Sequence, residues 1–108
     1  MSKRIVFEHD GKEYTLEYTL RTAALANQDG FVLDELGDKL ALMVPKLVYW
    51  AFNKNHKNVT RKMSDEIFSE ITQKNEFIAA LAEMYAEACN ALIDDEDGDT
   101  GNANWTLS

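Results

Sequence analysis

The sequence predicts an α+β fold that is mainly α-helical: an N-terminal β-hairpin followed by four to five helices and a flexible, acidic C-terminal tail. Apolar residues alternate around an Asp-Gly pair near the start, and later segments carry apolar residues at helical spacing. The 108 residues include one Pro and five Gly, which leaves most of the chain free to be helical. This length suits one domain over residues 1–93, with residues 94–108 as the tail.

The hairpin is predicted from residues 4–18, in which Asp10-Gly11 separates two apolar segments. The Asp-Gly pair suits a two-residue type I′ turn, because both turn residues need a positive φ. One face of the second strand would carry Tyr14, Leu16 and Tyr18. Since an isolated hairpin is only marginally stable in water, we expect this face to pack on the helices that follow.

Two helices are predicted in the first half of the chain. The first spans Leu20 to Gln28, and Gly30 suits a left-handed C-terminal cap from which Phe31 can fold back. The second is expected to begin at Asp34, whose carboxylate can cap free backbone N–H groups. Pro45 lacks an N–H group and clashes with the preceding turn, so we expect a kink or a short break there.

Two more helices are predicted in the second half. Residues 53–58 contain no apolar residue and should form an exposed connector. The next helix would be capped by Thr60 or Ser64 and end near Thr72. The last helix, roughly Asn75 to Ile93, has the clearest apolar stripe, with spacings of three and four. This stripe comprises Phe77, Leu81, Met84, Ala88 and Leu92, widened by Ile78, Tyr85 and Cys89.

Charge separates the tail from the rest of the chain. Of the formal net charge of −8, five negative charges come from Asp94, Asp95, Glu96, Asp97 and Asp99, which leaves −3 for the remainder. Binding to nucleic acid or to anionic lipid depends on clustered Lys and Arg, so we expect neither a nucleic acid nor a membrane as a partner. The sequence also contains one Cys, no signal-peptide pattern and no apolar run of membrane-helix length, which favours a cytoplasmic protein.

No pattern in the sequence predicts an enzyme. Glycine-rich phosphate loops and nucleophile elbows are missing. With Gly98 at the sixth position of a calcium loop, Ile93 would take the first position and Asn104 the twelfth, where carboxylates are needed. Cys89 could be a nucleophile with His56 as its base, but its place in an apolar stripe favours a buried, inert thiol. We therefore expect no catalytic, cofactor-binding or metal-binding residues, and a function in binding another protein.

Two patches are candidate partner-binding sites. The first contains three aromatic residues that point in different directions around a helix, and aromatic residues dominate interface hot spots. The alternative is that all three pack under the hairpin or the last helix. The second patch is basic, and it could be a solvated loop or could hold the acidic tail or an acidic stretch of a partner. The candidate residues are Tyr49, Trp50 and Phe52 in the first patch and Lys54, Lys57, Arg61 and Lys62 in the second.

The order of the segments carries a family resemblance. The strand Gly11 to Tyr18 leads into a helix, and an aromatic helix ends in Trp50-Ala51-Phe52. A connector with His56 and Asn58, the segment Thr60 to Ile67 and an amphipathic last helix follow. This layout resembles the tail assembly chaperones of long-tailed bacteriophages, especially those of phages and prophages of Gram-positive bacteria. The likeness extends to about Ile93.

The resemblance implies a non-enzymatic protein that binds the tape measure protein and keeps it soluble in the host cytoplasm until tail tube subunits polymerise around it. The tape measure protein is the implied partner and the tail tube protein a second candidate. Many copies would be needed, which leaves self-association open. The family often makes a longer form by ribosomal frameshifting near the end of the gene. The alternative function, suggested by the charge of −8, is an acidic inhibitor that mimics nucleic acid and occupies a basic site on a host protein.

Overall fold

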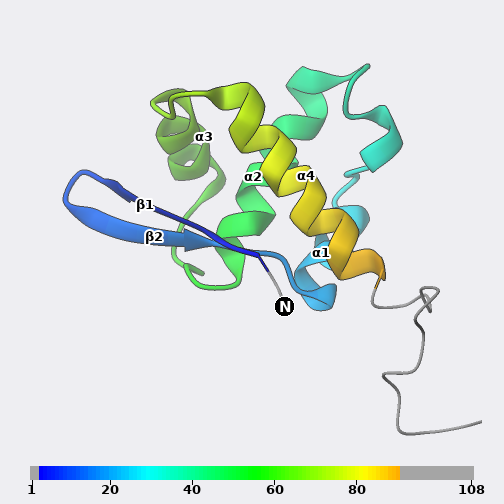
Figure 1. The fold of residues 1–108 in the computed structure, drawn as a ribbon, viewed down its shortest axis with the longest axis horizontal. Coiled ribbons are helices and arrows are strands. Elements are labelled where there is room, and N and C mark those ends of the chain that lie inside the picture. The colour runs from blue at the N-terminus through cyan, green and yellow to red at the C-terminus, as the bar shows by residue number, and fades with distance from the viewer. Residues whose placement is uncertain (1–2, 91–108) are drawn as a thin grey trace, which may run out of the picture.

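The computed structural model describes residues 3–90, which form an N-terminal hairpin followed by four α-helices (Figure 1). This arrangement confirms the predicted α+β, mainly α-helical class. The predicted tail, residues 94–108, lies outside the described residues. The elements in chain order are β1 (Ile5–His9), β2 (Lys12–Leu16), α1 (Leu20–Gln28), the short 3₁₀ helix η1 (Leu33–Glu35), α2 (Leu40–Asn53), α3 (Arg61–Ser69) and α4 (Lys74–Asn90).

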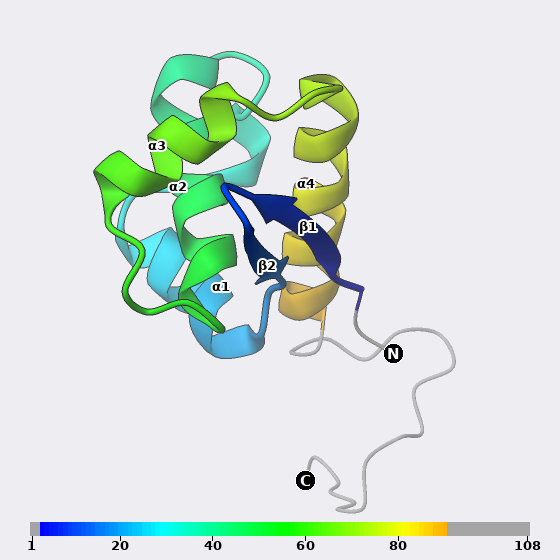
Figure 2. The ribbon, with the colours of Figure 1, turned by 90° about the vertical axis from the view of Figure 1, so that its left-hand side faces the viewer.

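The hairpin forms as predicted. Asp10 and Gly11 both have positive φ, 55° and 78°, and the two strands pair antiparallel with His9 opposite Lys12. The apolar face of β2 and the residues after it is buried, with Tyr14 6%, Leu16 0% and Tyr18 3% exposed. Figure 2 shows this hairpin lying across α2 and α4. Burial against the helices explains how a two-stranded sheet is stable in this chain.

Helix α1 has the predicted bounds and both of its ends are capped. At its N-terminus the Thr19 hydroxyl accepts a hydrogen bond from the Thr22 N–H group. At its C-terminus Gly30 has φ 105°, and the Phe31 N–H group donates to the Ala26 carbonyl at 2.9 Å. This is the predicted left-handed cap, and it directs the fully buried Phe31 into the core.

The predicted start of the second helix at Asp34 is wrong. Only η1 forms there, and the chain turns through Leu36-Gly37-Asp38 before α2 begins at Leu40. Glycine is unfavourable by roughly 1 kcal/mol inside a helix relative to Ala, which favours a break at Gly37. Pro45 lies inside α2, and the helix continues to Asn53, so the predicted short break at Pro45 is not found.

Helices α3 and α4 follow the predicted pattern with shifted ends. The Thr60 hydroxyl caps α3 by accepting from the Met63 N–H group at 3.1 Å, and the helix ends at Ser69 rather than near Thr72. The stripe of α4 faces the core, where Leu81, Met84 and Tyr85 are buried. Its predicted end at Ile93 lies outside the described residues.

Helix α2 is the centre of the domain. It contacts α1, α3, α4 and β2, and its residues Leu47, Val48, Ala51 and Phe52 are almost fully buried. The α2 ribbon therefore runs behind α4 and beside α3 in Figure 1. Within residues 3–90, no helix is both long and apolar enough to cross a membrane.

Candidate partner-binding site

The predicted aromatic patch is divided between the core and a half-buried cluster. Phe52 is 1% exposed, so its prediction as a partner-binding residue is wrong. Its ring packs edge-on against Tyr14 and Phe7, with centroid distances of 5.5 and 6.2 Å. Docking of the hairpin on α2 buries this side chain, in line with the alternative interpretation of the sequence.

Tyr49 and Trp50 are half-buried and belong to a cluster that joins three helices. The Trp50 indole Nε1 donates to Asp29 Oδ2 at 3.1 Å, and Arg61 Nη1 donates to the same oxygen at 2.7 Å. The Arg61 guanidinium also lies 4.4 Å from the centroid of the Tyr49 ring. Burial opposes ionisation of Asp29, but the hydrogen bonds from Arg61 and Trp50, together with the charges of Arg61 and Lys46, outweigh it and lower the pKa of this carboxyl. We call these residues, Asp29, Tyr49, Trp50 and Arg61, the Asp29 cluster.

The predicted basic patch is only partly available to a partner. Arg61 is held by Asp29, and Lys54 Nζ lies 3.2 Å from Glu17 Oε1. Lys57 and Lys62 are exposed, and no ion pair holds either of them within the part of the chain that the structure describes. The four cations therefore do not act as one free surface, although Lys57 and Lys62 remain accessible.

The connector of residues 53–58, predicted to be exposed, is bonded to the end of the hairpin by some of its side chains. The Asn55 amide donates to Glu17 Oε1 at 3.0 Å. This bond is the largest contribution that sets the pKa of Glu17, and it outweighs partial burial so that the pKa is lowered. The connector therefore helps to hold the hairpin on the helices.

His56 and Cys89 lie in different parts of the domain. His56 Nε2 accepts a hydrogen bond from the Thr15 N–H group at 2.9 Å, and its ring packs against Tyr14. Burial, with a smaller contribution from Lys12, lowers the pKa of His56. Cys89 instead lines a hollow between α1 and α4 with Tyr85. The pair considered from sequence as a nucleophile and its base is therefore not brought together.

No group of three or more His, Cys, Asp or Glu side chains among residues 3–90 is placed to hold a metal ion. The tail segment that was compared with a calcium loop, residues 93–104, lies outside the described residues.

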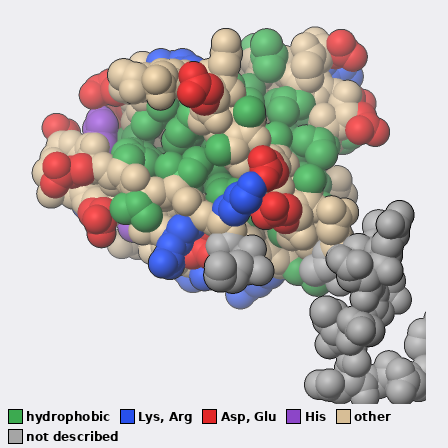
Figure 3. All heavy atoms as spheres, in the orientation of Figure 1, with side chains coloured by type: hydrophobic (Ala, Val, Ile, Leu, Met, Phe, Trp, Pro, Cys, Tyr) green, Lys and Arg blue, Asp and Glu red, His purple; other side chains and the backbone are tan. Residues whose placement is uncertain are grey.

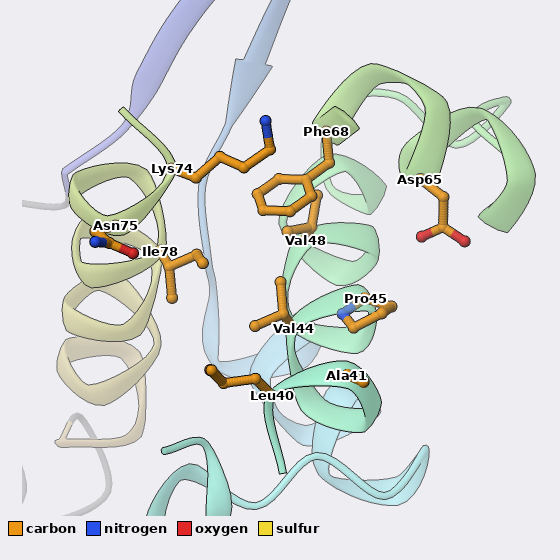
Figure 4. Close-up of a pocket in the computed structure, with 10 residues that line it drawn as sticks. All are labelled: Leu40, Ala41, Val44, Pro45, Val48, Asp65, Phe68, Lys74, Asn75 and Ile78. Atoms are coloured by element: carbon orange, nitrogen blue, oxygen red, sulfur yellow. The ribbon is translucent and has the colours of Figure 1, made fainter. Parts of the chain in front are cut away.

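An apolar groove of about 350 Å³ lies between α2, α3 and α4. In Figure 4 the side chains of Val44, Val48, Phe68 and Ile78 point toward one another across it, and Leu40 lies at one end. Leu40 is 54% exposed, so part of this apolar surface meets solvent. Hydrophobic side chains are also widespread on the molecular face that α4 crosses, with charged side chains between them (Figure 3).

Polar groups stand at the rim of the groove. Lys74 Nζ lies 5.5 Å from the centroid of the Phe68 ring and donates to the carbonyls of Ser69, the last residue of α3, and of Ile71 just beyond it. Asp65 also lines the groove, but its carboxylate points away from Val44 and Ile78 in Figure 4. An apolar floor with few polar groups at the rim suits the apolar face of an amphipathic helix better than a small polar substrate.

The sequence contains a signal for this groove that the search for aromatic and basic patches missed. Leu40 to Pro45 are six consecutive apolar residues. A helix with one buried face needs apolar residues only at spacings of three and four, so such a run exceeds what one face can bury. Leu40, Ala41, Leu42 and Pro45 are accordingly exposed, whereas Met43 and Val44 are buried.

Comparison with known proteins places the chain in a family. Residues 1–108 match the domain of unknown function DUF5055, and the chain belongs to this family. No curated protein matches the sequence. No solved structure matches it either.

Proposed function

We propose that this protein is a non-enzymatic tail assembly chaperone of a phage or prophage, which binds the tape measure protein in the host cytoplasm and keeps it soluble during tail assembly. The observation that carries the proposal is the apolar groove between α2, α3 and α4, with Leu40 exposed at its end. The segment order that resembles these chaperones supports the same function.

The groove suits the chemistry of the proposed partner. A long helical protein that has not yet been enclosed by the tail tube exposes apolar stripes to water. A groove beside an amphipathic helix covers such a stripe through apolar side chains at helical spacing. Its modest size allows binding that is reversible, so that tail tube subunits can displace many bound copies as they polymerise.

The alternative function, an acidic inhibitor that mimics nucleic acid, has less support. Such a mimic needs unpaired carboxylates spread over a folded face. In residues 3–90 several carboxylates are instead paired with cations of the same domain, among them Glu17, Asp29 and Glu35.

The chain offers a matched pair of substitutions to test the groove. Leu40 and Leu42 are both 54% exposed and both lie in the first turn of α2, but only Leu40 lines the groove. An acidic residue in a first helical turn is compatible with the helix dipole, so Leu40→Glu and Leu42→Glu should both fold. Each variant would be co-expressed with the tape measure protein of the same gene cluster, and the soluble, co-purifying fraction measured.

We expect Leu40→Glu to reduce the co-purifying fraction about tenfold, as expected for loss of an interface anchor, and Leu42→Glu to leave it near the wild-type level. If both variants reduced the co-purifying fraction equally, the groove would not be part of the interface. A tape measure protein that stays insoluble and never co-purifies with the wild-type chain would overturn the chaperone function itself.

A further inference from the structure

The outer edge of β2 is closed by the segment that follows α2. The Thr15 N–H group donates to His56 Nε2 at 2.9 Å, and the Thr15 carbonyl accepts from the Asn55 amide at 3.2 Å. Just beyond the strand, the Glu17 N–H group donates to the Ala51 carbonyl at 3.1 Å. These bonds occupy the outward backbone groups from Thr15 onward, so another strand cannot pair along this end of β2.

The outer edge of β1 is open. In a two-residue hairpin the residues beside the turn, His9 and Lys12, exchange hydrogen bonds, and such pairs alternate along the ladder. The backbone groups of Val6 and Glu8 therefore point away from β2. Among residues 3–90 no hydrogen-bond partner is found for these outward groups. The Val6 side chain is 52% exposed, and Arg4 and Glu8 on the same face are exposed as well.

An open edge of this kind restricts the registers in which two copies can pair. Outward backbone groups must face outward groups, so even-numbered residues of one copy have to lie opposite even-numbered residues of the other. Centring the pair on Glu8 or on Arg4 places like charges opposite each other. Centring it on Val6 places Val6 opposite Val6 and places Arg4 of each copy opposite Glu8 of the other. This register combines a β-branched pair with two pairs of opposite charge.

We propose that two copies of this chain associate through β1, antiparallel about a two-fold axis at Val6, to form a continuous sheet in the order β2, β1, β1, β2. Figure 1 shows β1 as one margin of the hairpin. The contact is isologous, because the same patch serves in both copies. A single short strand gives a small interface, so the dimer is a weak and reversible one. None of Arg4, Val6 and Glu8 lines the groove, so this association stands apart from the proposed function.

Charge exchange gives a direct test by sedimentation equilibrium over a range of protein concentrations. Arg4→Glu places two carboxylates opposite each other in each cross-strand pair, and Glu8→Arg places two guanidinium groups there. We expect each single variant to raise the dimer dissociation constant about tenfold, from the loss and reversal of two cross-strand charge pairs. The double variant Arg4→Glu/Glu8→Arg should dimerise as the wild type does, and an equimolar mixture of the two single variants should form mixed dimers.

Val6→Pro is a second variant that tests the backbone contribution. The Val6 N–H group faces outward, so a proline there removes no hydrogen bond within the hairpin and should leave the circular dichroism spectrum unchanged. It should abolish dimerisation. A wild-type chain that is monomeric at every accessible concentration would overturn the proposal. So would a dimer that all these variants leave unchanged, because that dimer would use another surface.

Discussion

The His56 side chain accepts a hydrogen bond from β2 that the backbone of a neighbouring strand would accept in a larger sheet. Its Nε2 atom accepts the Thr15 N–H group, so this nitrogen has to carry a lone pair rather than a proton. Burial lowers the pKa of His56 in the folded state below its ordinary value of 6.5. Protonation would remove the acceptor and leave the Thr15 N–H group without its partner.

We predict a pH-dependent loss of stability that originates at His56. Because the unfolded state binds a proton more readily than the folded state, the free energy of unfolding should fall as the pH decreases below about 6.5. His56→Gln supplies an acceptor that does not titrate, so this variant should lose less stability between about pH 6.5 and 5. At about pH 8 the free energy of unfolding of His56→Gln should be less than about 1.5 kcal/mol below that of the wild type. Urea unfolding of both proteins at several pH values measures the difference.

Other titrating groups do not obscure this window. The pKa values of Glu17 and Asp29 are lowered from 4.5 and 3.8, so their contributions to stability are lost only at more acidic pH. Identical pH profiles for wild type and His56→Gln would contradict the prediction.

Single residues with a local signal could be predicted from the sequence. Asp10-Gly11, Gly30 and Thr60 act on backbone groups close to themselves in the chain, and all three have the predicted roles. The burial of Phe52 and Trp50 depends on their contacts with Tyr14 and Asp29, which are distant in the sequence. Periodicity identified them as aromatic helix residues, but it could not tell which of them faces the hairpin.

At the scale of elements, α2 departs most from the prediction. Asp34 has the side chain of a helix cap, yet Leu36-Gly37-Asp38 turns the chain first. Pro45, the expected site of a kink or a short break, lies inside a continuous helix. Packing of Met43, Val44, Leu47 and Val48 in the core favours a continuous helix despite the proline. Tertiary packing thus overrides the local preference of the sequence.

Pro45 should therefore be a source of instability that substitution relieves. Pro45→Ala restores a backbone N–H group opposite the Ala41 carbonyl and removes a steric clash, at an exposed position. We expect the free energy of unfolding to rise by about 1–3 kcal/mol, reduced by the greater freedom that alanine gives the unfolded chain. Chemical denaturation followed by circular dichroism measures this change.

Pro45→Gly is the control, because it restores the N–H group but has a lower helix propensity than alanine. It should be less stable than Pro45→Ala by about 1 kcal/mol. If Pro45→Ala proved no more stable than the wild type, the prediction would be wrong, and backbone adjustments around Pro45 would already relieve its steric clash.

At the scale of the whole molecule, the Asp29 cluster ties the end of α1 to α2 and to the start of α3. Arg61 and Lys62 are adjacent in the first turn of α3, but only Arg61 makes contacts in this cluster. We predict that Arg61→Ala lowers the free energy of unfolding by about 1 kcal/mol, while Lys62→Ala changes it by less than about 0.5 kcal/mol. Urea titrations of the two variants compare them directly. Equal effects would show that the cluster contributes no more than an ordinary surface contact.

The groove exists only when α2, α3 and α4 are assembled, which limits what the sequence could predict about it. Leu40, Phe68 and Ile78 are distant in sequence, and each is an ordinary apolar helix residue by itself. The six apolar residues from Leu40 to Pro45 indicate an excess of apolar surface but not the helices that will border it. The fold class could be predicted because it rests on periodicity within each element. The shape of the surface could not, because it rests on how the elements pack.

The open edge of β1 has a practical consequence for anyone who produces this protein. An affinity tag joined ahead of Lys3 would emerge beside β1, where an extended peptide could add to the free strand and compete with a second copy. A tag joined after residue 108 would not lead directly into β1, because residues 91–108 separate it from the end of α4. Preparations tagged at opposite ends are therefore expected to differ in their apparent mass at high concentration. The position of the tag should accordingly be controlled in any measurement of self-association.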